Sequence, residues 1–143
     1  MELLIANNKK MKLQKQLRFS IFEMLNGVSG AYQTTPTQTL NFNELLEYYN
    51  SPENKKLSDA IINAPTPEAK NNLKSKRAYY TPYGIFSTRK NANILDKNNI
   101  VSIDIDELKN TDHAIEIRNK LAKHPSVLFA LLSTRGKGVK AMM

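Results

Sequence analysis

The sequence contains no cysteine, only two histidines and no long apolar run. Without cysteine the chain can form no disulfide, no thiolate metal site and no cysteine nucleophile. The histidines, His113 and His124, are too few for a histidine-rich metal site, and we expect both to be surface or capping residues. No apolar run approaches the roughly 18 residues that cross a membrane. The first residues also lack the basic and apolar regions of a secretory signal, so we expect a cytoplasmic protein without membrane association.

The composition is that of a globular protein with unevenly distributed charge. Hydrophobic residues make up 41% and charged residues 24% of 143 residues, which excludes a disordered or collagen-like chain and indicates one domain. The net charge is +8: residues 70–100 and 117–143 are basic, and residues 101–116 between them carry five acidic side chains and one basic one. An acidic segment between basic segments suits a site where metal ions link carboxylates to phosphates. The alternative is a solvated surface with uneven charge.

The first 98 residues predict an α-rich segment after a flexible start over residues 1–15. Residues 13–25 fit either a helix or a strand, because apolar residues recur there at both spacings. A loop follows over residues 27–39, and capping signals predict helices over residues 42–49, 55–63 and 67–75. Residues 79–89 are predicted to be extended, with a turn at residues 82–84.

Residues 99–143 carry the clearest pattern of the chain. They predict a strand over residues 100–106, a helix over residues 112–123 capped by Thr111, a central buried strand over residues 127–132, a turn at 135–138 and a further strand from residue 139. This order gives the first four elements of a split β-α-β, ferredoxin-like core, which still needs a helix and a strand. We therefore expect an α+β fold and a single, truncated domain over residues 1–143, in which residues 16–98 precede the core.

Asp104 and Asp106 form the sharpest candidate site. At positions i and i+2 of a strand, the two carboxylates project from the same face, with Cβ atoms roughly 6.5–7 Å apart. Mg²⁺ is commonly bound by one or two carboxylates together with water and substrate phosphates, so this pair could provide most of a metal–nucleotide site. The alternative is a strand end that carries two solvated acids.

The segment over residues 133–140 is a second candidate, for phosphate binding. Its glycines, Gly136 and Gly138, allow close approach of the backbone to a ligand, and its remaining candidate residues supply a hydroxyl or positive charge: Ser133, Arg135, Lys137 and Lys140. It is not a Walker loop, because the spacing and the following helix are absent. The alternative is a hairpin turn with glycine for positive φ and lysine for solubility.

A third candidate is a basic cluster upstream of the core. Tyr79, Tyr80 and Tyr83 lie beside five cations, which are Lys74, Lys76, Arg77, Arg89 and Lys90. Interleaved aromatic rings and cations suit a nucleic-acid strand, through base stacking and phosphate contact. The alternative is a set of core tyrosines beside a solvated face.

Four segments, taken in order, resemble one known family. They are LK at residues 73–74, TPYGIF at 81–86, NIVSIDID at 99–106 and LSTRGKGVK at 132–140. Their order and spacing resemble the N-terminal domain of VirE-type (virulence-associated E) replication proteins, in the archaeo-eukaryotic primase, or primase-polymerase, superfamily. The resemblance covers residues 16–143 and favours a strand over residues 16–23.

This resemblance implies an RNA-recognition-motif-like catalytic core. It assigns Asp104 and Asp106 to a motif that binds Mg²⁺ or Mn²⁺, and Ser133 with residues 136–140 to a motif that contacts nucleotide phosphates. Arg135 stands where many relatives have histidine, and the third, acidic motif has no counterpart before Met143. The implied partners are nucleoside triphosphates, a single-stranded or primed template and a downstream helicase-like ATPase region in a protein of a phage or another mobile element.

The expected function is therefore metal-dependent nucleotidyl transfer on nucleic acid, as in a primase-polymerase. One alternative is a non-catalytic DNA-binding or replication-initiation module, or an inactive fragment. Another is a phosphatase of the haloacid dehalogenase type, in which Asp104 and Ser133 would be the reactive pair, although Glu107 and Leu108 replace its usual Gly-Thr.

Overall fold

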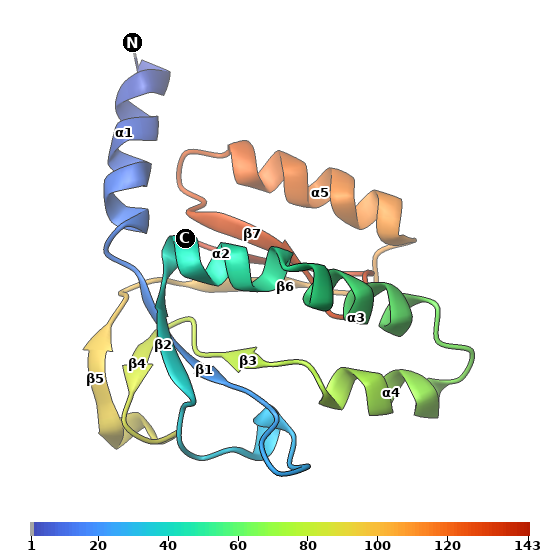
Figure 1. The fold of residues 1–143 in the computed structure, drawn as a ribbon. Coiled ribbons are helices and arrows are strands. Elements are labelled where there is room, and N and C mark those ends of the chain that lie inside the picture. The colour runs from blue at the N-terminus through green and yellow to red at the C-terminus, as the bar shows by residue number, and fades with distance from the viewer. Residues whose placement is uncertain (1) are drawn as a thin grey trace. The chain divides into compact units, whose positions relative to one another are not determined.

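The structure of the protein, a computed structural model, describes residues 2–143 and has an α+β fold (Figure 1). The chain divides into two compact units. Unit 1 combines the N-terminal residues up to Gln16 with Ile100–Met143, and unit 2 is Leu17–Asn99. The single domain over residues 1–143 stays a prediction, and its internal limits, after residues 15 and 98, each differ by one residue from the boundaries of these units. The pattern of residues could not show that the two ends of the chain belong to the same unit.

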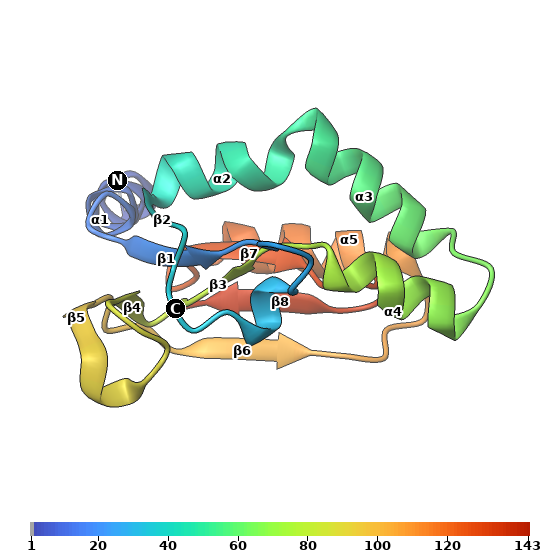
Figure 2. The ribbon, with the colours of Figure 1, turned by 60° about the horizontal axis from the view of Figure 1, so that its bottom comes forward.

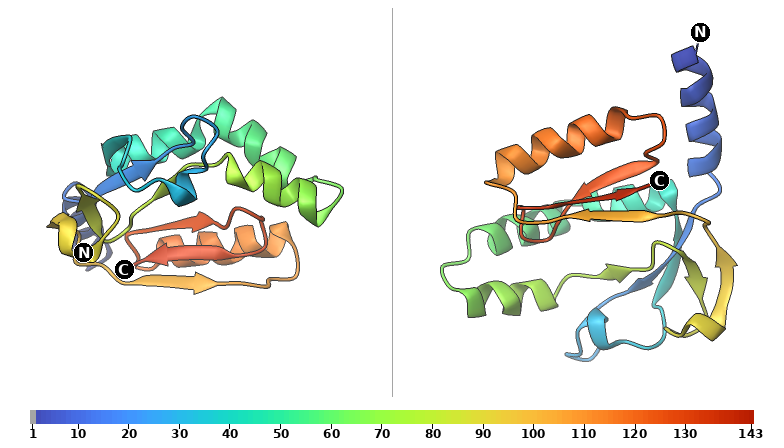
Figure 3. Two further views of the ribbon diagram at one scale, coloured as in Figure 1. Left: turned by 90° about the horizontal axis from the view of Figure 1, so that it is seen from below. Right: turned by 180° about the vertical axis from the view of Figure 1, so that it is seen from behind.

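Unit 1 contains the split β-α-β arrangement that the sequence predicts. Its strands are β6 (Ser102–Ile105), β7 (Phe129–Leu132) and β8 (Val139–Met142), and helix α5 (Thr111–Lys123) connects β6 to β7. Strand β8 pairs antiparallel with both other strands and lies between them, so β6 and β7 run parallel to each other. Figure 3 (left) shows the three strands side by side with α5 behind them. The prediction of a central strand at residues 127–132 is wrong, because the β7–β8 hairpin places β8 in the middle.

Helix α5 covers one face of this sheet. Val139 and Ala141 of β8 are fully buried, as is Ala114 of the helix. The N-cap is Asn110, not Thr111 as predicted: its side-chain oxygen accepts the N–H of His113 at 2.8 Å. His124 ends the helix as its C-cap, which confirms the capping role expected of it.

The flexible start expected over residues 1–15 is instead helix α1 (Glu2–Gln14). Lys10 Nζ donates to the carbonyl of Ala122 at 2.7 Å, and the side-chain amide of Gln14 donates to the carbonyl of Leu128. Apolar residues of α1 do not gather on one face, so the sequence carries no amphipathic signal for this helix. Contacts with distant parts of unit 1 hold it, as is usual for helices in proteins.

Unit 2 is built on a three-stranded antiparallel sheet with the order β2-β1-β3. Strand β1 (Arg18–Phe22) confirms the strand interpretation of residues 16–23, and its Phe19, Ile21 and Phe22 are fully buried. The remaining elements are β2 (Gln38–Asn41), α2 (Phe42–Asn50), α3 (Pro52–Ile62), α4 (Pro67–Ser75), β3 (Tyr79–Tyr80), β4 (Gly84–Phe86) and β5 (Ile94–Lys97), with 3-10 turns η1 (Gly30–Tyr32) and η2 (Asn91–Asn93). Helix α3 packs against α4 (Figure 2).

Two of the three predicted helix starts of unit 2 are confirmed, those of α2 and α4. Asn41 and Glu44 form a reciprocal capping box at α2, and Thr66 caps α4 before Pro67. Helix α3 begins three residues earlier than predicted, because Ser51 also caps it and Pro52 occupies its first position. Strands β2 and β5 were not predicted, since each has four residues and forms by pairing, β2 with β1 and β5 with β4.

The two ends of unit 2 are tied together by Arg18 and Asn98. The backbone N–H of Arg18 donates to Asn98 Oδ1 at 2.9 Å, and Asn98 Nδ2 donates back to the Arg18 carbonyl at 2.7 Å. Asn98 Nδ2 also donates to the carbonyl of Pro82 at 2.8 Å. One side chain therefore joins the start of unit 2, its end and the β3–β4 connection.

Candidate functional site

The candidate metal residues lie on the face of the unit 1 sheet opposite α5. Asp104 of β6 is directly across from Lys140 of β8, which in turn is across from Leu131 of β7. Alternate residues of a strand face opposite sides, so Asp104 and Lys140 point away from the buried Val139 and Ala141. The Lys140 ammonium forms an ion pair with Asp104 Oδ2, and nearly half of each side chain is exposed. The face is therefore polar and accessible at Asp104 and Lys140, whereas Phe129 and Met142, two residues along the same face, are buried.

The next register row brings Asp106 and Ser133 to one point. Asp106 follows β6, Ser133 follows β7, and Gly138 between them precedes β8 and accepts the N–H of Ser133 at 2.8 Å. A Cβ atom on residue 138 would lie 3.0 Å from Asp106 Oδ1 and 3.1 Å from Ser133 Oγ. Because Gly138 has no side chain, the carboxylate of Asp106 and the hydroxyl of Ser133 both lie close to the space beside its Cα atom.

The turn at Gly136 fits the alternative interpretation of this segment, a hairpin turn that needs glycine for positive φ. Gly136 N–H donates to the Ser133 carbonyl at 2.9 Å, and its φ of 73° lies in the left-handed region that favours glycine. Arg135 and Lys137 are exposed on this turn, and the Lys137 carbonyl accepts the N–H of Leu108 at 2.9 Å. The turn is therefore fixed on the chain that follows β6 and presents two exposed cations.

The donor set of this site fits a hard cation that shares its coordination with a substrate. Among the described residues, no group of three or more histidine, cysteine, aspartate or glutamate side chains could hold a metal ion by itself. Asp104 and Asp106 supply two carboxylates and Ser133 a hydroxyl, all oxygen ligands of the type Mg²⁺ and Mn²⁺ accept. Mg²⁺ usually retains water and takes phosphate oxygens as further ligands, so two carboxylates suffice for such a site.

The two arginines of the upstream cluster are used within unit 2. Arg77 Nη1 donates to Ser58 Oγ at 2.8 Å, and its guanidinium carbon lies 5.5 Å from the centre of the Tyr49 ring. Burial lowers the pKa of Arg77. The alternative of a solvated face does not describe this residue, because its half-buried guanidinium joins α3 and α2 to the end of α4.

Arg89 anchors the loop after β1 in the same way. Its guanidinium donates to the carbonyls of Ala31 at 2.5 Å and Gly30 at 2.9 Å, and lies 4.0 Å above the Phe22 ring. Its backbone N–H donates to the Thr34 carbonyl at 2.7 Å. Of the five cations expected to guide nucleic acid, Lys74, Lys76 and Lys90 are those for which the structure shows no such structural use, and Lys76 and Lys90 are exposed.

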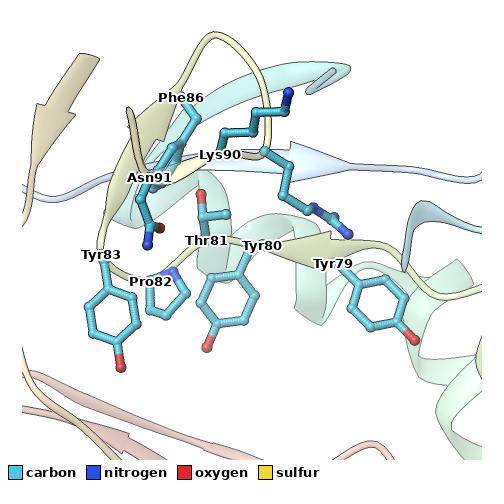
Figure 4. A pocket seen from close by; sticks show the side chains of 9 residues that line it. Tyr79, Tyr80, Thr81, Pro82, Tyr83, Phe86, Lys90 and Asn91 are labelled. Carbon is cyan, nitrogen blue, oxygen red and sulfur yellow. The ribbon is translucent and has the colours of Figure 1, made fainter. Parts of the chain in front are cut away.

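The tyrosines beside this cluster divide between core and surface. Tyr80 packs edge-to-face against Phe19 and Tyr49, with ring centres 5.9 and 5.8 Å apart. Tyr83 is 51% exposed. A pocket of about 490 Å³ lies along this segment and is lined by Tyr79, Tyr80, Thr81, Pro82, Tyr83, Phe86, Arg89, Lys90 and Asn91 (Figure 4). The sequence singles out only the tyrosines and cations of this set as candidate ligands; Phe86, which ends β4, and Asn91, which begins η2, carry no such signal.

The comparisons with known proteins assign a family to the chain. The model of a family described as "BT4734-like, N-terminal domain" matches residues 72–143, half of the chain. This corrects the resemblance to VirE-type proteins: the four segments that carry it all lie in the matched region, but the matching family is a different one. No curated protein and no solved structure matches the chain. Across residues 2–143, none of the helices combines the length and apolar character needed to span a membrane.

Proposed function

The chain belongs to the BT4734-like N-terminal domain family, and we propose that unit 1 of this member binds a divalent cation with a nucleoside triphosphate for nucleotidyl transfer on nucleic acid in the cytoplasm. The observation that carries this proposal is the point at Gly138, which Asp106 and Ser133 flank. Asp104 and Lys140 lie in the adjacent register row of the same face. Carboxylates, a hydroxyl and cations at one sheet end are the groups that phosphoryl transfer requires.

Each group of the site has a distinct role in this proposal. Asp104 and Asp106 would hold Mg²⁺ or Mn²⁺, and Ser133 Oγ would donate to a phosphate oxygen. When bound, the ion lowers the pKa of an attacking hydroxyl and offsets the charge of the triphosphate. Arg135 and Lys137 would attract the triphosphate through their charge. The N–H groups of Ser133 and Gly136 already serve the hairpin, so phosphate contact depends mainly on side chains.

Lys140 gives the site two states. Its ammonium neutralises Asp104 and occupies the position of a cation on that carboxylate. A divalent ion competes with the ammonium for the same oxygen, because both are attracted by the same negative charge. Once displaced, Lys140 remains on the same face and can contact phosphate. The ion pair thus offsets the repulsion between two nearby carboxylates in the unliganded protein.

A non-catalytic nucleic-acid-binding module is the second candidate function. It is favoured by the Asp104–Lys140 pair, which leaves one of the two carboxylates already neutralised. A phosphatase of the haloacid dehalogenase type has less support, since Ser133 lies beside Asp106 while Lys140 holds Asp104. Dependence of ligand binding on a divalent cation separates nucleotidyl transfer from the module.

The test measures Mn²⁺ binding to the full chain by electron paramagnetic resonance, with and without a non-hydrolysable nucleoside triphosphate. We expect Asp104→Asn with Asp106→Asn to abolish binding, whereas Asp112→Asn, which alters an exposed acid at the start of α5, leaves it intact. Extension of a primed template should follow the same pattern. Equal Mn²⁺ binding by the double variant contradicts the site, and nucleic-acid binding that needs no divalent cation and is not followed by extension supports the non-catalytic module.

A further inference from the structure

The pocket of unit 2 has one apolar, aromatic side and one polar side. Figure 4 shows the rings of Tyr83 and Tyr79 at the two ends of the extended segment, with Pro82 and Tyr80 between them. Lys90 and Asn91, both exposed, come from the loop after β4. A volume of about 490 Å³ lies in the range of sites that enclose small planar ligands. The lining therefore offers ring surfaces for stacking and a cation for a phosphate.

The walls of this pocket are held by hydrogen bonds inside unit 2. Thr81 Oγ1 donates to the Gly84 carbonyl at 2.8 Å and accepts the N–H of Ser20 at 3.2 Å. Ser20 Oγ, which is fully buried, accepts the N–H of Phe86 at 2.9 Å. The hydrogen bonds from Arg89 to the carbonyls of Gly30 and Ala31 fix a further lining residue. A pocket that is preformed loses little conformational freedom when it binds a ligand.

We propose that this pocket binds an unpaired base of single-stranded nucleic acid, with the adjoining phosphate on the side of Lys90. Residues 70–100 carry seven basic side chains and one acidic one, which favours a polyanion. Aromatic rings stack on the faces of bases, and these faces are accessible in a single strand but covered in a duplex. The proposal goes beyond the function proposed for unit 1, because this binding needs neither Asp104 nor a metal ion.

The cations of this segment differ in what they contact, and this indicates which of them can bind the phosphate. The guanidinium groups of Arg77 and Arg89 are turned to Ser58, Gly30 and Ala31 inside the unit. Phosphate contact at the pocket thus falls to Lys90. One ammonium gives attraction without base recognition, so we expect little preference for sequence and comparable binding of DNA and RNA.

The experiment measures fluorescence anisotropy of labelled oligothymidylate, oligouridylate and a duplex with the full chain in EDTA. We expect both single strands to bind and the duplex to bind much more weakly. Tyr83→Ala should weaken binding about tenfold through lost stacking, and Tyr83→Trp should restore it. The matched control is Tyr32→Ala, which removes an 80% exposed tyrosine of the same unit outside the pocket.

Salt dependence separates the roles of ring and cation. Lys90→Ala should reduce the slope of log affinity against log salt by about 0.7, the contribution of one phosphate contact on a single strand, while Tyr83→Ala leaves that slope unchanged. Lys56→Ala, an exposed lysine on α3, serves as the control and should not alter the slope.

Several outcomes overturn the proposal. They are equal binding of the duplex, an unchanged affinity of Tyr83→Ala, an equal loss in Tyr32→Ala, and competition by thymidine monophosphate as strong as that by the oligomer. The variant with Asp104→Asn and Asp106→Asn must still bind the strand; loss of binding there would assign the strand to unit 1 instead. Failure of the metal site in unit 1 leaves these measurements unaffected.

Discussion

Charged residues serve different purposes in the two units. In unit 1, Asp104 and Lys140 pair on an exposed sheet face. In unit 2, Arg77 and Arg89 donate to neighbouring oxygens and lie against aromatic rings. A basic run in the sequence can thus be part of the fold or a surface for ligands. The comparison predicts that removing Arg77 or Arg89 of unit 2 costs stability, whereas removing the exposed charges of the unit 1 sheet face mainly changes binding.

The largest expected effect is that of Arg89→Ala. The variant loses two charged hydrogen bonds and a cation–π contact, so we expect unfolding to become easier by about 3 kcal/mol. Chemical denaturation monitored by circular dichroism measures this change. Lys90→Ala, the exposed neighbouring cation, should stay within about 0.5 kcal/mol of the wild type. Equal stability of the two variants would remove the distinction between the units.

Arg77→Ala should come next, with a loss of about 2 kcal/mol. It removes one charged hydrogen bond to Ser58 and the contact with the Tyr49 ring. Lys76→Ala changes the adjacent exposed cation and should have little effect on the denaturation midpoint. If Arg77→Ala left the free energy of unfolding unchanged, Arg77 would again be a candidate nucleic-acid ligand.

Gly138→Ala should affect both stability and binding in unit 1. The added Cβ would lie 2.6 Å from the Ile105 carbonyl oxygen and between Asp106 and Ser133, so we expect a loss of about 1–2 kcal/mol. Mn²⁺ affinity should fall by about tenfold or more as these groups are displaced. Gly27→Ala is the control: its φ of 75° makes alanine cost about 1 kcal/mol, but Mn²⁺ binding should not change.

The smallest effect on stability is expected for Lys140→Met. The exposed ion pair with Asp104 contributes less than about 1 kcal/mol. Mn²⁺ affinity should instead rise, since no ammonium competes for the carboxylate, while triphosphate affinity falls. Lys120→Met breaks the exposed Lys120–Glu116 pair on α5 and should leave both affinities unchanged. Titration calorimetry distinguishes these results, and an unchanged Mn²⁺ affinity of Lys140→Met would contradict the competition.

Much of the secondary structure could be predicted, because local signals decide it. The capping box at Asn41 and the Thr66-Pro67 start specify their helices directly. Helix α1 and strand β5 could not be predicted, since α1 depends on contacts with Ala122 and Leu128, and β5 depends on pairing with β4. The position of β8 between its neighbours likewise depends on strand pairing, which the residues of β8 alone do not reveal.

The candidate site of unit 1 was predictable for a related reason. Asp104 lies in an alternating strand and Asp106 directly follows it, and the glycine hairpin follows a run of apolar residues, so both features are visible in the sequence. Their proximity requires the strand order. The pocket of unit 2 was only partly visible: Tyr83 and Lys90 are recognisable as an aromatic ring and a cation, but Phe86 and Asn91 reach the pocket through the tertiary fold.

The reciprocal hydrogen bonds between Arg18 and Asn98 have a consequence for how the chain is made. Unit 2 is one continuous stretch whose two ends meet, whereas unit 1 is assembled from the first and the last portions of the chain. During synthesis on the ribosome, all of unit 2 emerges while unit 1 still lacks every strand of its sheet. Unit 1 is therefore completed last, after an inserted unit 2 that can close on itself beforehand.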